Sequence, residues 1–261
     1  MKILFFGDVI GRPGREAVKK ILPKLKEKFQ PNLIIINGEN LAHGTGLSSK
    51  TTKEMFDAGV NLITGGNHSF KNEDGLKLLD NPQTPIIRPL NYPSNMPGRG
   101  SIKLEVMNQS VIVFNLVGQA FMKDDVANPF KAAQEFIREN SKSSKIIILD
   151  WHAEATSEKI AMGKLVDGQI SAVFGTHTHV PTADWEITKK GTAFVSDVGM
   201  CGVKDSVIGV EKTLILKHFL EEEPVKFELA QGDVVINAVS LTVDDKNGKA
   251  IKFEKINELV S

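Results

Sequence analysis

The sequence is poor in cysteine and has no excess of charge. Cys201 is the one cysteine among 261 residues, so neither a disulfide nor a zinc site with several thiolates can form within the chain. Lys plus Arg and Asp plus Glu each total 32, which gives a net charge of zero. Without a global basic field, we expect no long nucleic acid and no anionic membrane as a partner. A small anion remains allowed, because it needs only local positive charge.

Long hydrophobic runs are also missing. The run Ile3–Phe6 near the N-terminus is far too short for a signal peptide or a membrane span. We therefore expect a cytoplasmic protein. No repeat, low-complexity segment or Ser/Gly-rich linker interrupts the sequence, and 41% of it is hydrophobic. These features predict a single domain over residues 1–261.

Short apolar runs are present instead, and each ends in polar or glycine-rich residues. Five of them are Ile3–Phe6 before Gly7-Asp8, Leu33–Ile36 before Asn37–Asn40, Asn61–Thr64 before Gly65–His68, Ile146–Leu149 before Asp150–His152, and Ala172–Phe174 before Gly175–His179. Runs of about four aliphatic or aromatic residues are typical of strands that are buried on both faces.

Helical patterns lie between several of these runs. Apolar residues recur at helical spacing from Arg15 to Phe29, and Pro23 is expected to kink or split that helix. Lys50–Ala58 and Pro129–Asn140 are predicted as further helices.

The C-terminal part has a strand pattern. Asp233–Val243 and Ile251–Ile256 alternate as strands do, and Asp245–Gly248 between them has turn residues. Strands that alternate with helices and then end in a pair of strands predict an α/β sandwich with mixed sheets.

The polar residues at the strand ends are the main functional signal. Taken singly, each has a structural explanation: Asp8 can cap a helix, Asn40 can lie in a turn, and a lone histidine such as His152 can be a satisfied interior group. Together they are harder to explain structurally, because four of the six histidines follow buried strands. In open α/β sheets ligands bind outside the carboxyl ends of the strands.

These residue types are those of a metal centre. Imidazole nitrogens with carboxylate or amide oxygens suit Zn, Mn, Fe or Co. In His177-x-His179, alternate residues of an extended segment share a face, so both rings can point at one spot. Seven candidate ligands are too many for one tetrahedral ion and suit two ions ~3.5–4 Å apart. They are Asp8, Glu39, Asn40, Asn67, His152, His177 and His179.

At these positions the chain resembles the calcineurin-like metallophosphoesterase superfamily, whose pattern is D-x-H, G-D, G-N-H-(D/E), H and G-H-x-H. The corresponding segments occur in order from residue 7 to residue 179: Gly7-Asp8-Val9-Ile10, Gly38-Glu39-Asn40, Gly66-Asn67-His68-Ser69, His152 and Gly175-Thr176-His177-Thr178-His179.

Three positions depart from that pattern. Ile10 replaces the first histidine, Glu39 replaces the bridging aspartate, and Ser69 replaces the acidic residue that usually orients the neighbouring histidine. The amide oxygen of Asn40 can replace the lost ligand. The same variant is found in the YmdB-type bacterial phosphodiesterases, which the chain also resembles in the segments Gly7–Arg15, Arg88–Pro93, Asp197–Gly202 and Ser206–Gly209.

The resemblance implies a four-layer α-β-β-α fold and hydrolysis of phosphate esters, with 2′,3′- and/or 3′,5′-cyclic nucleotides as substrates. It also implies two metal ions, with Fe or Mn favoured over Mg, Co or Zn. A homo-oligomer is left open.

In the scheme that follows from these ligands, Asp8, Asn40 and His179 hold one metal. Asn67, His152 and His177 hold the other, and Glu39 bridges the two. A hydroxide between the metals attacks phosphorus. His68 is not a ligand in this scheme but the catalytic group that protonates or stabilises the departing oxygen.

Alternative functions are a Rossmann-type nucleotide-binding protein, a non-catalytic nucleotide-binding regulator on the same fold, and a phosphomonoesterase. Gly7, Gly11 and Gly14 prompt the first, but their spacing is not G-x-G-x-x-G and no G-K-[ST] follows.

Other polar residues have weaker signals. His43 is interpreted as a solvated loop residue and His218 as a surface residue. The sequence does not choose a phosphate ligand among Arg12, Arg15, Arg88 and Arg99.

Overall fold

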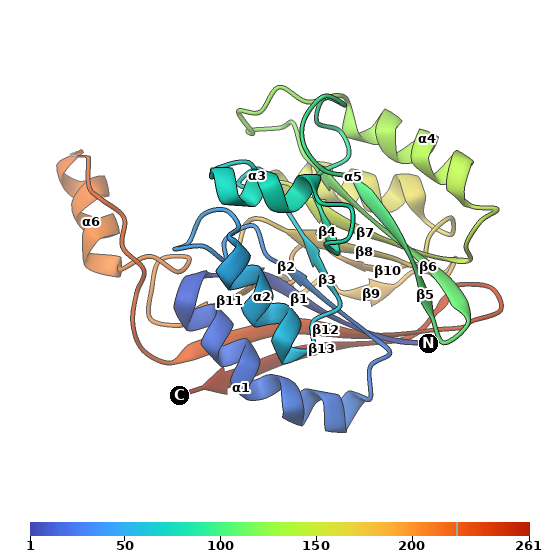
Figure 1. Cartoon of the computed structure of the whole chain (residues 1–261), viewed down its shortest axis with the longest axis horizontal. Coiled ribbons are helices and arrows are strands. Elements are labelled where there is room, and N and C mark those ends of the chain that lie inside the picture. Colours follow the sequence, from blue (N-terminus) through green and yellow to red (C-terminus); the bar gives the residue numbers. More distant parts are fainter. Residues whose placement is uncertain (223) are drawn as a thin grey trace.

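In the computed structural model, which describes residues 1–222 and 224–261, the chain forms helices and two β-sheets (Figure 1). The helices are α1 (Gly11–Phe29), α2 (Ser49–Ala58), α3 (Glu73–Asp80), α4 (Pro129–Asn140), α5 (Thr156–Val166) and α6 (Lys212–Glu221). The strands are β1 (Lys2–Val9), β2 (Leu33–Asn37), β3 (Leu62–Thr64), β4 (Ile86–Ile87), β5 (Ser101–Val106), β6 (Gln109–Val117), β7 (Ile146–His152), β8 (Ala172–Thr176), β9 (Glu186–Ile187), β10 (Ala193–Val195), β11 (Met200–Val203), β12 (Val234–Val243) and β13 (Ala250–Val260).

Both sheets are mixed. The first has the order β13-β12-β11-β1-β2-β3-β4, with an additional pairing between β12 and β1. Strand β1 is parallel to β2 and β11 but antiparallel to β12. The second sheet has the order β5-β6-β7-β8-β10-β9, in which β6, β7, β8 and β10 are parallel and the outer strands are antiparallel.

The alternation of side chains along the strands creates three apolar layers. In β1, Leu4 and Phe6 face α1 and α2, whereas Ile3 and Phe5 face the second sheet. On that sheet, Phe114 packs towards α4 and α5. The order of layers is therefore helix, sheet, sheet, helix, and the predicted four-layer sandwich is confirmed.

Helix starts follow local capping rules. Ser48 and Thr51 form a capping box at the start of α2. Asn128 accepts a hydrogen bond from the Lys131 N–H at the start of α4, where Pro129 takes the first helical position. The helices predicted from Lys50 and Pro129 therefore begin within one residue of where the structure places them.

Pro23, which was expected to kink or split the first helix, does not split it. Helix α1 runs from Gly11 to Phe29 with Pro23 inside it, and its ribbon bends partway along in Figure 1. A proline removes one N–H bond and crowds the preceding turn. The buried face of this helix, which includes Val18, Leu22 and Leu25, continues across that point and holds both halves on the sheet.

No helix in the described ranges is long and apolar enough to cross a membrane.

Candidate metal centre

The predicted ligands come together where strands of the two sheets meet. His152 ends β7 and lies at the centre of one group. Its Nε2 is 3.1 Å from Nδ1 of His177, 3.1 Å from Oε2 of Glu39 and 3.1 Å from Oδ1 of Asn67. Glu39 follows β2, Asn67 follows β3 and His177 follows β8. Five separate chain segments, counting that of Asp8, therefore converge on one spot.

A second group adjoins the first through Glu39. The His179 Nε2 is 3.7 Å from Oδ1 of Asp8 and 3.4 Å from Nδ2 of Asn40. Asn40 Nδ2 also donates to Oε1 of Glu39 at 3.1 Å. The two carboxylate oxygens of Glu39 thus face different groups, one towards His152 and one towards Asn40.

Two observations show that this site fits metal ions. The Oδ1 of Asp8 is fully buried and has no hydrogen-bond donor, a costly state for a carboxylate oxygen unless a cation satisfies it. Gly66 leaves open space between the donors, because a Cβ there would lie 2.1 Å from Oε2 of Glu39 and 2.4 Å from Nε2 of His152. The donors are nitrogen and oxygen atoms without thiolate, as Zn, Mn, Fe and Co prefer.

Each of the three histidines has its other ring nitrogen engaged. His152 Nδ1 is 2.9 Å from the Thr176 hydroxyl, and His179 Nδ1 is 3.1 Å from the carbonyl oxygen of Ile208. His177 Nε2 is 3.0 Å from the Glu154 carboxylate. An N–H that donates outwards leaves the inner nitrogen with a lone pair. The inner nitrogens of His152 and His179 face carboxylates, and that of His177 faces Nε2 of His152.

A buried polar network supports His152 from behind. The Thr176 hydroxyl donates to Oδ1 of Asp150 at 2.7 Å, so it can accept from His152 Nδ1. Asn37 Nδ2 donates to Oδ2 of Asp150 at 2.9 Å, and the hydroxyl of Thr64 donates to the same oxygen. Burial raises the pKa of Asp150 to about 6. The network fixes the plane and the tautomer of the His152 ring.

The charges of the inner groups depend on one another. Burial opposes ionisation of Glu39, but His152 and His68 hold the pKa of Glu39 well below its usual range. Against the effect of burial, Glu39 in turn raises the pKa of His152 to about 9. Burial, together with the charge on His152, lowers the pKa of His177 to about 3. The buried carboxylates therefore depend on positive charge nearby, which a metal cation would supply.

His68 lies at the edge of this site. Its Nδ1 is 2.8 Å from Oδ1 of Asn40 and 3.2 Å from Oε1 of Glu39. Its backbone N–H donates to Oε2 of Glu39 at 3.0 Å. The side chain is 32% exposed, whereas His152 is fully buried. His68 is thus the more accessible of the two rings.

The His177-x-His179 segment is a tight turn rather than the extended segment that its spacing predicts. His177 and His179 have φ angles of 95° and 65°, in the left-handed region that non-glycine residues seldom adopt. Between them, the N–H and the hydroxyl of Thr178 donate to Oδ2 of Asp197 at 3.0 and 2.6 Å. Buried Lys159 pairs with the same oxygen at 2.8 Å. This buried ion pair holds the strained turn in place.

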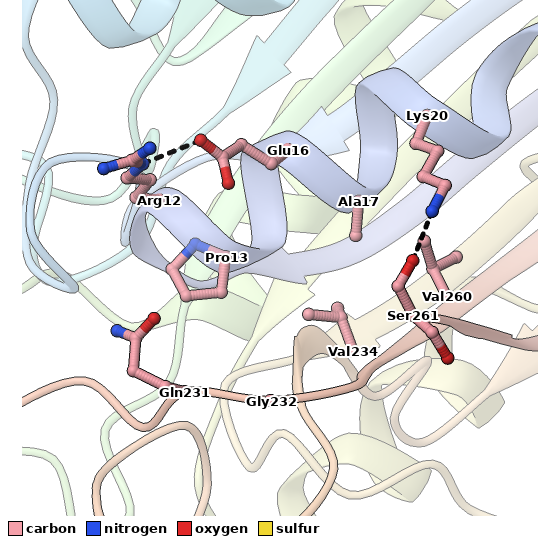
Figure 2. Close-up of a pocket in the computed structure, with 10 residues that line it drawn as sticks. All are labelled: Arg12, Pro13, Glu16, Ala17, Lys20, Gln231, Gly232, Val234, Val260 and Ser261. Carbon is pink, nitrogen blue, oxygen red and sulfur yellow. Dashed lines mark hydrogen bonds and ion pairs between the residues drawn. The ribbon is translucent and has the colours of Figure 1, made fainter.

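The arginines that the sequence left as phosphate candidates are engaged elsewhere. Arg15 pairs with Glu54, Arg88 donates to the carbonyl oxygens of Pro89 and Leu90, and Arg99 donates to that of Thr84. Arg12 points at Glu16 in a cavity of about 500 Å³ between α1 and the C-terminal strands (Figure 2). No predicted metal ligand is among the residues that line that cavity.

His43 and His218 line a different cavity, of about 520 Å³, which also includes Asn40, His68 and His179. His43 is exposed, as expected for a loop residue, but it lies beside the candidate site.

Sequence reasoning missed the residues that orient the ligands. Asp150 and Thr176 were within the expected strand ends, and Glu154 is two residues after His152, yet nothing in the spacing assigned them a role. A backbone carbonyl such as that of Ile208 has no signature in the sequence. Asp197 was noticed in a family segment, but its link to Thr178 depends on the fold.

Comparison with known proteins agrees with this geometry. The family model described as YmdB-like protein matches residues 4–256. A 2′,3′-cyclic-nucleotide 2′-phosphodiesterase of Bacillus subtilis is 43% identical over 256 residues, which cover 98% of this chain and 96% of that protein. The crystal structure of a novel phosphatase from Mycoplasma pneumoniae has a TM-score of 0.94 and 38% identity, and covers 99% of this chain and 93% of its own.

A more distant structure shows the fold. The calcineurin-like phosphoesterase YfkN of Bacillus subtilis matches with a TM-score of 0.61 and 14% identity, over 100% of this chain and 90% of its own. The matched range contains all of the converging donors. The chain belongs to the YmdB-like protein family, on the calcineurin-like phosphoesterase fold, and is a phosphoric ester hydrolase.

Proposed function

We propose that the chain is a metal-dependent phosphodiesterase that hydrolyses cyclic nucleotides, with 2′,3′-cyclic nucleotides as the first candidates and 3′,5′-cyclic nucleotides as the second. The observation that carries this proposal is the convergence of the free nitrogens of His152, His177 and His179 on two buried carboxylates. The name of the Bacillus subtilis relative supports the choice of substrate.

In this proposal the two groups of donors would hold two metal ions. Asp8, Asn40 and His179 would hold one ion, and Asn67, His152 and His177 would hold the other. Glu39 would serve both, because its two oxygens face different groups. Fe or Mn fits a donor set of nitrogen and oxygen, with Mg, Co and Zn as alternatives. Bound ions in such pairs lower the pKa of a water towards ~7 and neutralise charge on phosphoryl oxygens.

Asn40 and His68 act as a pair in this proposal. The Nδ1–H of His68 has two acceptors, Oδ1 of Asn40 at 2.8 Å and Oε1 of Glu39 at 3.2 Å. In its imidazolium form, His68 gives its Nε2 proton to the departing ribose oxygen as the bond from that oxygen to phosphorus breaks. It is then a neutral imidazole that keeps its proton on Nδ1.

The first test is metal dependence. We expect about two metal ions per chain, loss of activity in a strong chelator, and recovery with Mn or Fe. Elemental analysis and turnover of 2′,3′-cyclic AMP measure these outcomes. Full activity in chelator, with no tightly held metal detected, contradicts the proposal.

The second test separates His68 from the ligands. Glu39→Gln removes the shared anion, so one or both metals should be lost. His68→Ala should keep both metals and lower turnover of a cyclic nucleotide by ~10²–10⁴-fold, because its alkoxide leaving group needs a proton. The defect should be small for a nitrophenyl ester, whose leaving group needs none. Metal loss in His68→Ala, or equal defects with both substrates, excludes the general-acid role.

A further inference from the structure

A cavity of about 520 Å³ adjoins the candidate metal centre. Asn40, His68 and His179 form one part of its lining. The remaining lining residues are Ile10, His43, Gly44, Thr45, Val207, Ile208, Val210, Ile215, His218, Phe219, Phe227, Glu228 and Leu229. Any molecule that places a phosphate at the metal centre therefore has this cavity beside it, and the size is within the ~300–1,000 Å³ of small-ligand sites.

One wall of the cavity comes from the described part of residues 206–229, between β11 and β12. Bridges join Val207 to Val210 and Val210 to Leu229, so this segment folds back on itself. Leu229 packs closely on Gly11 and Gly44, where a Cβ would lie 2.2 and 2.9 Å from its methyl carbons. Helix α6 belongs to the same segment and stands away from the two sheets in Figure 1.

The wall is fixed to the metal centre through Ile208. This β-branched residue has a φ angle of 48°, a strained conformation for its type. The strain places its carbonyl oxygen 3.1 Å from Nδ1 of His179. Ile208 thus lines the cavity and also orients the predicted ligand His179, so the cavity wall has a fixed position relative to the candidate metal centre.

The lining suits a flat, neutral and apolar group. Among the described residues it includes no lysine or arginine, and its titratable side chains outside the candidate metal centre are His43, His218 and Glu228. Half of the lining residues are aliphatic or phenylalanine. Phe219 and Phe227 remain 73% and 57% exposed, although large apolar rings are usually covered. The His218 ring lies edge-on to Phe227, with 6.0 Å between centroids.

We propose that this cavity is the nucleobase subsite, in which Phe219 and Phe227 provide the aromatic surface on which the base of the substrate stacks. A nucleotide has what the site requires, namely a phosphate at one end and a flat aromatic group within reach of it. The inference rests on the proposed function, since it takes the phosphate to be held at the metal centre.

The test compares Phe219→Ala and Phe227→Ala with Leu220→Ala. Leu220 is on the same helix and is 82% exposed, but it does not line the cavity. Two substrates are used: 2′,3′-cyclic AMP, and glycerol 1,2-cyclic phosphate, which has the same five-membered cyclic ester but no base. Binding of adenosine 3′-phosphate to each metal-loaded protein is measured by calorimetry, independently of turnover.

Loss of base stacking should raise KM for 2′,3′-cyclic AMP by about 5- to 150-fold in Phe219→Ala or Phe227→Ala. Neither change should affect glycerol 1,2-cyclic phosphate, Leu220→Ala should behave as the original protein, and Phe227→Tyr should restore binding. Adenosine 3′-phosphate should lose affinity by a similar factor in the two alanine variants.

Three results overturn the subsite. The first is an equal effect of the alanine substitutions on both substrates, and the second is no effect on nucleotide binding. The third is a different oligomeric mass of the alanine variants in solution, which assigns the two rings to an interface between copies of the chain. A failure of the proposed function gives a different result from these three. In that case the original protein hydrolyses neither substrate, and nucleotide binding by the alanine variants still decides whether the rings hold a base.

Discussion

Gly66 has no side chain and so leaves room among the donors of the candidate metal centre. A methyl group there would lie within 2.4 Å of Glu39 and of His152. We predict that Gly66→Ala binds less metal than the original protein and loses activity, because the donors must move apart. Elemental analysis checks the metal content, and circular dichroism checks the fold.

Gly202→Ala is the matched control for Gly66→Ala. Gly202 is also buried, but the nearest atom to a Cβ there is Sδ of the flexible Met200 side chain, at 3.0 Å. This variant should keep its metals. If both variants lose metal equally, crowding at Gly66 is not the cause.

Cys201 is a free cysteine buried in the core. Burial raises the pKa of its thiol to about 12, so roughly one molecule in 10,000 carries the reactive thiolate at pH 8. We expect no reaction with an alkylating reagent in the folded protein and complete reaction in denaturant. Below pH 12 the thiolate fraction rises about tenfold per pH unit. Rapid labelling of the folded protein at pH 8 contradicts this expectation.

Single residues also show which parts of the site the sequence can predict. Histidines and carboxylates are costly to bury, so their repeated presence after apolar runs indicates a shared purpose. The partners that orient them have no such signal. Thr176 resembles any strand residue, and the carbonyl oxygen of Ile208 belongs to a residue that sequence analysis treats as apolar.

At the scale of the elements, the turn that contains His177 and His179 depends on α5. Lys159 of α5 and Asp197 form a buried ion pair at 2.8 Å that also fixes Thr178. We predict that Lys159→Met lowers the free energy of unfolding by about 3–5 kcal/mol, because it leaves a buried carboxylate unpaired. Metal affinity should fall as well, because the strained turn loses its support. Urea unfolding and metal titration measure the two effects.

Lys164→Met, on the same helix, is the control. Lys164 is exposed and lies 3.8 Å from exposed Glu186, so its loss should cost about 0–1 kcal/mol. Equal losses in the two variants would show that the helix, and not the buried pair, supports the turn.

Helix α5 is one of the elements that the sequence did not predict. The buried positions of α5 are Met162 and Val166 together with Glu158, Lys159 and Gly163, so its inward face is not a continuous apolar stripe. Helices α2 and α4, which were predicted, both begin at residues that follow local capping rules. Strands β12 and β13 pair antiparallel along most of their length, as their alternation and intervening turn indicated.

At the scale of the molecule, the candidate metal centre takes its donors from both sheets. Asp8, Glu39 and Asn67 come from the first sheet, whereas His152 and His177 come from the second. Metal at 100 times its Kd adds about 2.7 kcal/mol to the free energy of unfolding, so its removal should lower the melting temperature by about 5–10 °C. Calorimetry with and without chelator measures the change. An unchanged melting temperature implies that no ion links the sheets.

We also propose that residues 1–261 form one domain, because the apolar layer between the sheets includes both Ile3 and Phe253. Unfolding in one transition, followed by circular dichroism and by tryptophan fluorescence, supports this proposal. Two separate transitions contradict it.

The position of β1 has a consequence for the chain as it leaves the ribosome. One edge of β1 pairs with β2, which follows closely in the sequence. Its other edge pairs with β11 and β12, and β12 begins only at residue 234. That edge therefore stays unpaired until these strands have been synthesised. At about 5–20 residues per second, that interval lasts roughly 10–50 s. During this time an apolar strand has an open edge that other chains can pair with. Protection of nascent chains by a chaperone should therefore matter most before β12 emerges.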